Sequence, residues 1–192
     1  NPRADASRLR PSCQDASRGT MPTMTHGGTK KFQDRLALWL ATGLGVGLAS
    51  PAPGTFGSLW GLPLALALGS FQQPMSQLVF ALGLVLLAIV IADRAASVLG
   101  GTKDPQAIVI DEFAALPIAF LGVGPLGWNK LLLGWLLFRV FDIAKPPPCQ
   151  RAEQLSGGIG IVADDVVAAV YACLSLHAII WLDSTLSLEY LQ

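Results

Sequence analysis

Five acidic residues lie at the ends of apolar segments or within them. Asp164 and Asp165 are adjacent; a glycine-rich turn precedes them and an apolar run follows. Asp111 and Glu112 form a second adjacent pair inside an apolar stretch, and Asp142 follows a third apolar run. Acidic groups in such surroundings are costly unless a cation neutralises them. Because Mg²⁺ takes carboxylate oxygens as ligands, the pattern favours a magnesium site.

The pair Asp111–Glu112 allows two interpretations when it is considered alone. Neighbouring helical residues point about 100° apart, so one acid can face a bundle interior while the other reaches its edge. A pair at a helix start is also stabilised by the helix dipole and need not bind anything. The recurrence of acids in three apolar settings favours a metal site over scattered helix caps.

Two cations accompany these acids near the end of one apolar run. Arg139 stands three residues before Asp142 and Lys145 three residues after it, so a helix would place them along one face. One interpretation is an ordinary helical ion pair with a lysine that reaches water. Beside a metal site, an arginine and a lysine would instead suit a phosphate monoester.

Glycine-containing segments could bring backbone amides close to an anion. Residues 43–57 hold too many glycines and prolines for a long regular helix, and a Ser or Thr is expected to cap a helix that restarts near residues 55–58. A bare loop between helices is the alternative. The candidate phosphate-contacting residues are Pro53, Gly54, Thr55, Ser58, Gly157 and Gly158.

The remaining sequence predicts an all-α fold. Hydrophobic residues make up 52% of the chain and charged residues 14%, against about 25% charged in soluble domains. Residues 75–92 and 166–182 approach the roughly 20 residues of a transmembrane helix. We expect a membrane-embedded helical bundle with about four apolar helices and Gly/Pro-rich interfacial loops; an unusually apolar soluble bundle is the alternative. The expected helices are 32–40, 59–71, 75–92, 107–121, 131–143 and 157–181.

The first 31 residues differ in character from the rest. They hold scattered Arg and Lys among Ser, Thr, Pro and Gly, which predicts a disordered tail or an over-extended N-terminus, with a targeting segment as the alternative. The helical domain is expected over residues 32–192. Net charge is zero, so the composition gives no indication of a nucleic-acid partner.

Four segments in order resemble the phosphatidylglycerophosphatase A family: residues 50–58, 110–113, 139–146 and 157–165. The resemblance spans roughly residues 40–174. It implies an all-helical enzyme of the bacterial inner (cytoplasmic) membrane, with several membrane passes. The implied reaction is Mg²⁺-dependent removal of the terminal phosphate of phosphatidylglycerophosphate, which yields phosphatidylglycerol in phospholipid biosynthesis.

On this hypothesis the five acids are catalytic and supply Mg²⁺ ligands or a base for water. Arg139 and Lys145 would hold the phosphate, the glycine-containing segments would cradle it, and the apolar helices would hold the lipid. Direct attack by an aspartate instead of water stays open. The rival is an ion-coupled transporter, which would place the same carboxylates near mid-bilayer. A third alternative is a membrane scaffold whose acids are merely helix caps.

Overall fold

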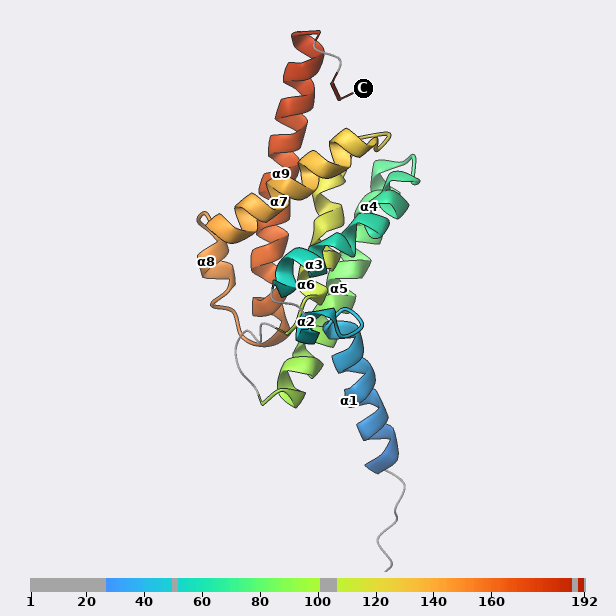
Figure 1. Cartoon of the computed structure of the whole chain (residues 1–192), viewed down its shortest axis with the longest axis vertical. Helices are drawn as coiled ribbons and strands as arrows, with labels where there is room; N and C mark the ends of the chain where they lie inside the picture. Colours follow the sequence, from blue (N-terminus) through green and yellow to red (C-terminus); the bar gives the residue numbers. More distant parts are fainter. Residues whose placement is uncertain (1–26, 50–51, 101–106, 188–189, 192) are drawn as a thin grey trace, which may run out of the picture.

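The computed structural model describes residues 27–49, 52–100, 107–187 and 190–191, and every regular element in these ranges is helical (Figure 1). The all-α prediction is therefore confirmed for this part of the chain. The elements are α1 (Gly27–Ala41), α2 (Val46–Ala49), α3 (Pro53–Leu59), α4 (Gly61–Gly69), α5 (Pro74–Val98), α6 (Ile110–Ala115), the 3₁₀ helix η1 (Leu116–Phe120), α7 (Trp128–Ala144), α8 (Cys149–Ala152) and α9 (Gly157–Thr185).

The bundle is organised around α9, which packs against α5, α7 and η1. Every residue of η1 is buried, and its Phe120 packs in the core with Phe138 of α7 and Leu176 of α9. Helix α5 presents small residues, such as Ala88 and Ala92, to a second buried cluster that includes Val162 of α9, so that the two long helices can approach closely. The acids of α6, α7 and α9 are thus carried on elements that these two clusters fix together.

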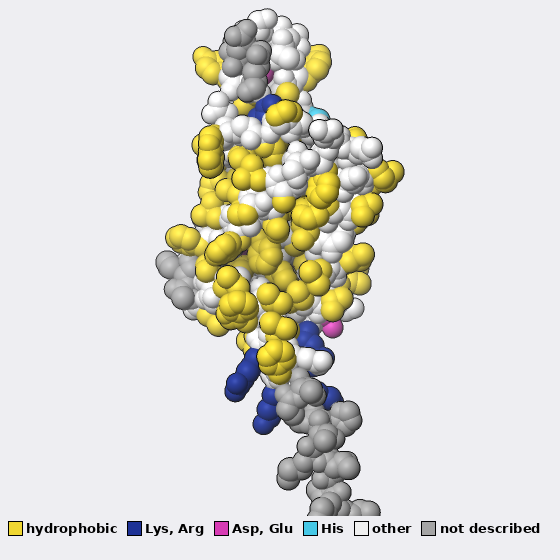
Figure 2. Space-filling view, turned by 90° about the vertical axis from the view of Figure 1, so that its right-hand side faces the viewer, with side chains coloured by type: hydrophobic (Ala, Val, Ile, Leu, Met, Phe, Trp, Pro, Cys, Tyr) yellow, Lys and Arg dark blue, Asp and Glu magenta, His cyan; other side chains and the backbone are white. Residues whose placement is uncertain are grey.

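Apolar side chains remain exposed on the outside of the bundle. Hydrophobic atoms cover the middle of the face in Figure 2, and Lys and Arg gather where α1 leaves it. On α5 the exposed apolar residues are Leu78, Val79, Leu82, Leu86, Leu87 and Val90. In the described ranges two helices, Pro74–Val98 and Gly157–Thr185, are long and apolar enough to cross a membrane.

Two of the departures from the expected helices have a clear physical cause. Helix α5 continues past Asp93 and Arg94, because partners on other helices meet both charges: Arg94 pairs with Asp34 of α1 at 2.8 Å, and Asp93 accepts a backbone hydrogen bond from α9. The single helix expected over residues 107–121 is wrong. Pro117 interrupts it, so that α6 gives way to the tighter turn of η1.

The start of α3 also differs from the prediction. The expected Ser or Thr cap is wrong, because Ala52 occupies the cap position and no side chain caps the helix. Pro53 begins the helix instead, as its fixed backbone angle allows. Helix α1 begins at Gly27, inside the predicted tail. Residues 1–26, like Ser50 and Pro51 of the predicted loop, lie outside the described residues, so the tail stays a prediction.

Candidate active site

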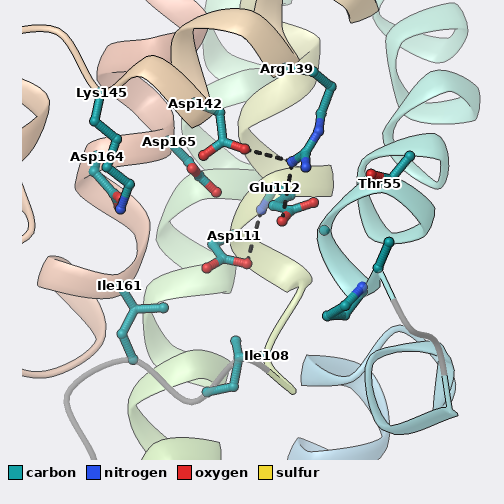
Figure 3. Close-up of a pocket in the computed structure, with 13 residues that line it drawn as sticks. Thr55, Ile108, Asp111, Glu112, Arg139, Asp142, Lys145, Ile161, Asp164 and Asp165 are labelled. Atoms are coloured by element: carbon teal, nitrogen blue, oxygen red, sulfur yellow. Dashed lines mark hydrogen bonds and ion pairs between the residues drawn. The ribbon is translucent and has the colours of Figure 1, made fainter.

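A cavity of about 400 Å³ lies where α3, α6, α7 and α9 meet (Figure 3). It brings together all five acids and both cations that the sequence singled out, and also Pro53, Gly54 and Thr55, three of the predicted phosphate-contacting residues. Its lining consists of Ala52, Pro53, Gly54, Thr55, Ile108, Asp111, Glu112, Arg139, Asp142, Lys145, Ile161, Asp164 and Asp165. Five carboxylates therefore face two cations in one space.

Arg139 links the acids of α6 and α7. Its Nη1 lies 2.5 Å from Oδ2 of Asp142, one helical turn along α7, and 3.4 Å from Oε1 of Glu112. Its side chain is 15% exposed, so water screens these pairs only in part. A Cβ at Gly54 would overlap Glu112 and come within 3.1 Å of the guanidinium, so only glycine lets α3 approach this closely.

Glu112 is the acid with the most unusual surroundings. Burial raises its pKa to about 7; Arg139 lowers it in part, and Asp142 raises it. Among the described residues, Oε2 of Glu112 is the one buried side-chain oxygen or nitrogen atom that has no hydrogen-bond partner. A buried carboxylate oxygen of this kind is unfavourable until a proton or a cation reaches it.

Lys145 reaches the pocket because helix α7 ends at this residue. It adopts a left-handed conformation with φ of 42°, and Pro146 follows. Its Nζ lies 2.8 Å from Asp164 and 3.3 Å from Glu153, which the sequence analysis missed. Burial disfavours the charge, but the two carboxylates outweigh it, so the pKa of Lys145 is raised. Lys145 therefore bridges to α9 and does not continue the face of α7.

Asp165 projects into the same cavity and is 4% exposed. Asp111, Glu112, Asp142 and Asp164 line the same cavity, so Asp165 has four acidic neighbours there. The ion pairs within the described ranges engage Arg139 and Lys145 with other acids and give Asp165 none. The pocket thus has more acidic side chains than its own cations neutralise.

Comparison with known proteins identifies the family. The sequence model described as Phosphatidylglycerophosphatase A matches residues 39–180, a range that contains the whole pocket. The chain belongs to the phosphatidylglycerophosphatase A family. This confirms the resemblance drawn from the four sequence segments.

Curated relatives agree with this family assignment. Phosphatidylglycerophosphatase A of Haemophilus influenzae is 40% identical over 141 residues, which cover 73% of this chain and 86% of the relative. The Escherichia coli protein of the same name is 32% identical over 141 residues, 73% of this chain and 81% of the relative. A putative phosphatidylinositol-3-phosphatase of Bacteroides thetaiotaomicron is 33% identical over 153 residues, which cover 76% of this chain and 94% of the relative. No solved structure matches the chain.

The acids of this phosphatidylglycerophosphatase A family member are of the chemical type that binds magnesium, but their present positions do not form a metal site. Its donors are carboxylate oxygens, which Mg²⁺ prefers, and the buried Oε2 of Glu112 lacks a partner. Yet no three His, Cys, Asp or Glu side chains in the described ranges are grouped closely enough to hold a metal ion as they stand. Side chains would therefore have to rotate toward a bound cation.

Three predicted phosphate-contacting residues do not line the cavity. Ser58 is fully buried; its hydroxyl donates to the Thr55 carbonyl and accepts from Trp135 Nε1 of α7, both at 3.0 Å. The hydroxyl therefore ties α3 to α7. Gly157 and Gly158 lie against α5, where the Gly158 amide donates to Oδ1 of Asp93 at 2.9 Å.

Asp93 is a supporting residue that the sequence analysis missed, although it was detectable as another acid at the end of an apolar run. With Gly158 it fixes the start of α9, the helix that carries Asp164 and Asp165. A Cβ at Gly158 would overlap the Ile89 carbonyl and lie 2.8 Å from Cβ of Asp93.

Gly158→Ala is therefore expected to lower the free energy of unfolding by about 1–3 kcal/mol, the range for overpacking. Gly83→Ala is the matched control on α5, because a Cβ there meets no atom within 4 Å. The control should be neutral or slightly stabilising, by up to about 1 kcal/mol. Thermal unfolding of the purified proteins measures both; equal unfolding temperatures for the two variants would refute the packing role of Gly158.

Proposed function

We propose that the acidic cavity is the active site of a phosphatidylglycerophosphatase. The chain is a phosphoric monoester hydrolase that dephosphorylates phosphatidylglycerophosphate in phospholipid biosynthesis. The observation that supports this location is the gathering of five carboxylates with an arginine and a lysine in one space. Family membership favours this function over the transporter and the scaffold considered from sequence.

Arg139 and Lys145 are the proposed phosphate-binding residues. Both already contact carboxylates, and a phosphate monoester would compete with Asp142 for Arg139 and with Asp164 for Lys145. The guanidinium can bind two phosphate oxygens at once, and the ammonium adds a second charge. Pro53, Gly54 and Thr55 line the same space at the start of α3 and would border the bound headgroup.

Glu112 is the proposed group for proton transfer. A pKa of about 7 is suited to accept a proton from water and to return one near neutral pH. Its Oε2, which is buried and has no hydrogen-bond partner among the described residues, is the atom that would take the proton. Attack on phosphorus by an aspartate instead of a water molecule is the alternative within this proposal.

Magnesium is the proposed cofactor, held by carboxylates from the set Asp111, Glu112, Asp142, Asp164 and Asp165; Glu112 would serve either as a ligand or as the proton-transfer group, since one carboxylate oxygen cannot hold Mg²⁺ and a proton at once. Bound there, it would stabilise the charge on the phosphate oxygens. Removing divalent cations with a chelator should lower phosphate release from phosphatidylglycerophosphate by about 100-fold or more, since such charge stabilisation is worth several kcal/mol. Adding back Mg²⁺ should restore the rate, as measured with purified protein in mixed micelles. An undiminished rate in excess chelator would exclude the metal.

The proposed location is the bacterial inner membrane, which the chain would cross several times. The two long apolar helices and the exposed apolar face of α5 support it. Helix α1 contains Lys30, Lys31 and Arg35, and Figure 2 shows basic side chains gathered at one end of the exposed apolar surface. By the positive-inside rule, that end would face the cytoplasm.

A further inference from the structure

A second cavity, of about 260 Å³, has no charged residue in its lining. It lies among the end of α1, the loop after it, the start of α4 and one residue of α6. Its lining residues are Leu40, Gly43, Leu44, Trp60, Pro63, Leu64 and Phe113. Leu44 and Trp60 are 48% and 46% exposed, so the cavity opens to the outside.

Two elements connect this cavity to the acidic one. In α6, Glu112 lines the acidic cavity and the next residue, Phe113, lines the apolar cavity. Helix α3 begins with Pro53 at the acidic cavity and is followed by Trp60 at the apolar one. Since α3 has seven residues, the two cavities are separated by about 10 Å along its axis.

This separation matches the headgroup of a phosphorylated phospholipid. In phosphatidylglycerophosphate, about eleven bonds join the terminal phosphorus to the first acyl carbon. An extended chain advances about 1.2 Å per bond, so the headgroup spans at most about 13 Å. A substrate whose phosphate lies between Arg139 and Lys145 can therefore place an acyl chain at Trp60 and Leu64.

We propose that the apolar cavity binds the first part of a substrate acyl chain, so that α3 acts as the spacer between phosphate and lipid. The proposal rests on the assignment of the acidic cavity as the phosphate site. The expected occupant is the acyl chain of the substrate and not that of a bulk membrane lipid, because only the substrate has a phosphate that can bind in the acidic cavity at the same time. Each methylene transferred from water to such a site strengthens binding by about fourfold.

The kinetic test uses two water-soluble substrates, phosphatidylglycerophosphate with four-carbon and with eight-carbon chains. For the wild-type protein, kcat/KM should rise at least about tenfold from the shorter to the longer chain. Leu64→Trp fills the cavity and should bring this ratio down toward one. Leu66→Trp is the matched control: it is the same change on the same helix, at a residue 45% exposed and outside the lining, and the ratio should stay high.

The outcomes separate this proposal from the proposed function. Phosphate release from neither substrate by the wild-type protein would contradict the phosphatase assignment. Release from both, with the chain-length ratio unchanged in Leu64→Trp or lowered equally in Leu66→Trp, would overturn the acyl site alone.

Photolabelling of the wild-type protein gives a second readout that no variant can confound. A substrate analogue with a diazirine on its acyl chain should label the segments that contain Leu64 and Phe113. Excess eight-carbon phosphatidylglycerophosphate should suppress this labelling, and an equal amount of phosphatidylcholine should not. Equal suppression by both lipids would assign the cavity to bulk lipid and overturn the proposal.

Discussion

Asp165→Asn is expected to lower kcat/KM for phosphatidylglycerophosphate by about 100- to 1,000-fold without loss of folding stability. The change keeps the size of the side chain and removes its charge. Asp165 is buried, faces the pocket and has no cationic partner in the described structure. A buried acid placed among other acids, with no ion pair of its own in the described ranges, is best explained by a cation held during the reaction, and such stabilisation is worth several kcal/mol.

The stability measurement distinguishes a functional charge from a structural one. Because Asp165 is buried among other acids and has no ion pair in the described ranges, asparagine at this position should leave the unfolding temperature equal or higher. Asp183→Asn is the control on the same helix: Asp183 is also buried, but it accepts backbone hydrogen bonds from Tyr190 and Leu191. That variant should lose stability and keep its rate. Full activity of both Asp165→Asn and Asp164→Asn would disprove the site.

The gathering of the acids could be predicted from sequence because apolar segments must fold against one another. Acids at the ends of those segments, or within them, then meet wherever the helices pack, as Asp111, Asp142 and Asp165 do. The spacing of Arg139 and Asp142 on one helix face was also sufficient to predict their contact. Local rules of this kind depend only on helical geometry.

The supporting contacts could not be predicted, since they depend on how separate helices approach. The role of Gly158 depends on Ile89 and Asp93, about 65 residues away in sequence. Ser58 carries a hydroxyl that suits a phosphate, yet Trp135 on α7 takes it as a hydrogen-bond acceptor. Lys145 reaches Asp164 only because its backbone turns left-handed at the end of α7.

Arg139→Lys should lower kcat/KM by about 100-fold and weaken inhibition by inorganic phosphate. Lysine keeps the positive charge but cannot bind two oxygens of a carboxylate or a phosphate in one plane. Arg139 bridges Glu112 and Asp142 in the described structure, so the substitution also loosens the acids that line the pocket. Arg151→Lys on α8 is the control: Arg151 is exposed, so kcat/KM of this variant should equal that of the wild type.

Arg139→Ala separates the structural share of this effect from the catalytic one. It leaves two largely buried acids without their cation, which should lower the free energy of unfolding by about 3–5 kcal/mol. Arg139→Lys retains the charge and should lose far less stability while its rate still falls. A lysine variant with the wild-type kcat/KM and phosphate inhibition would show that Arg139 only neutralises the acids. The phosphate would then have to be held by Lys145 and the metal alone.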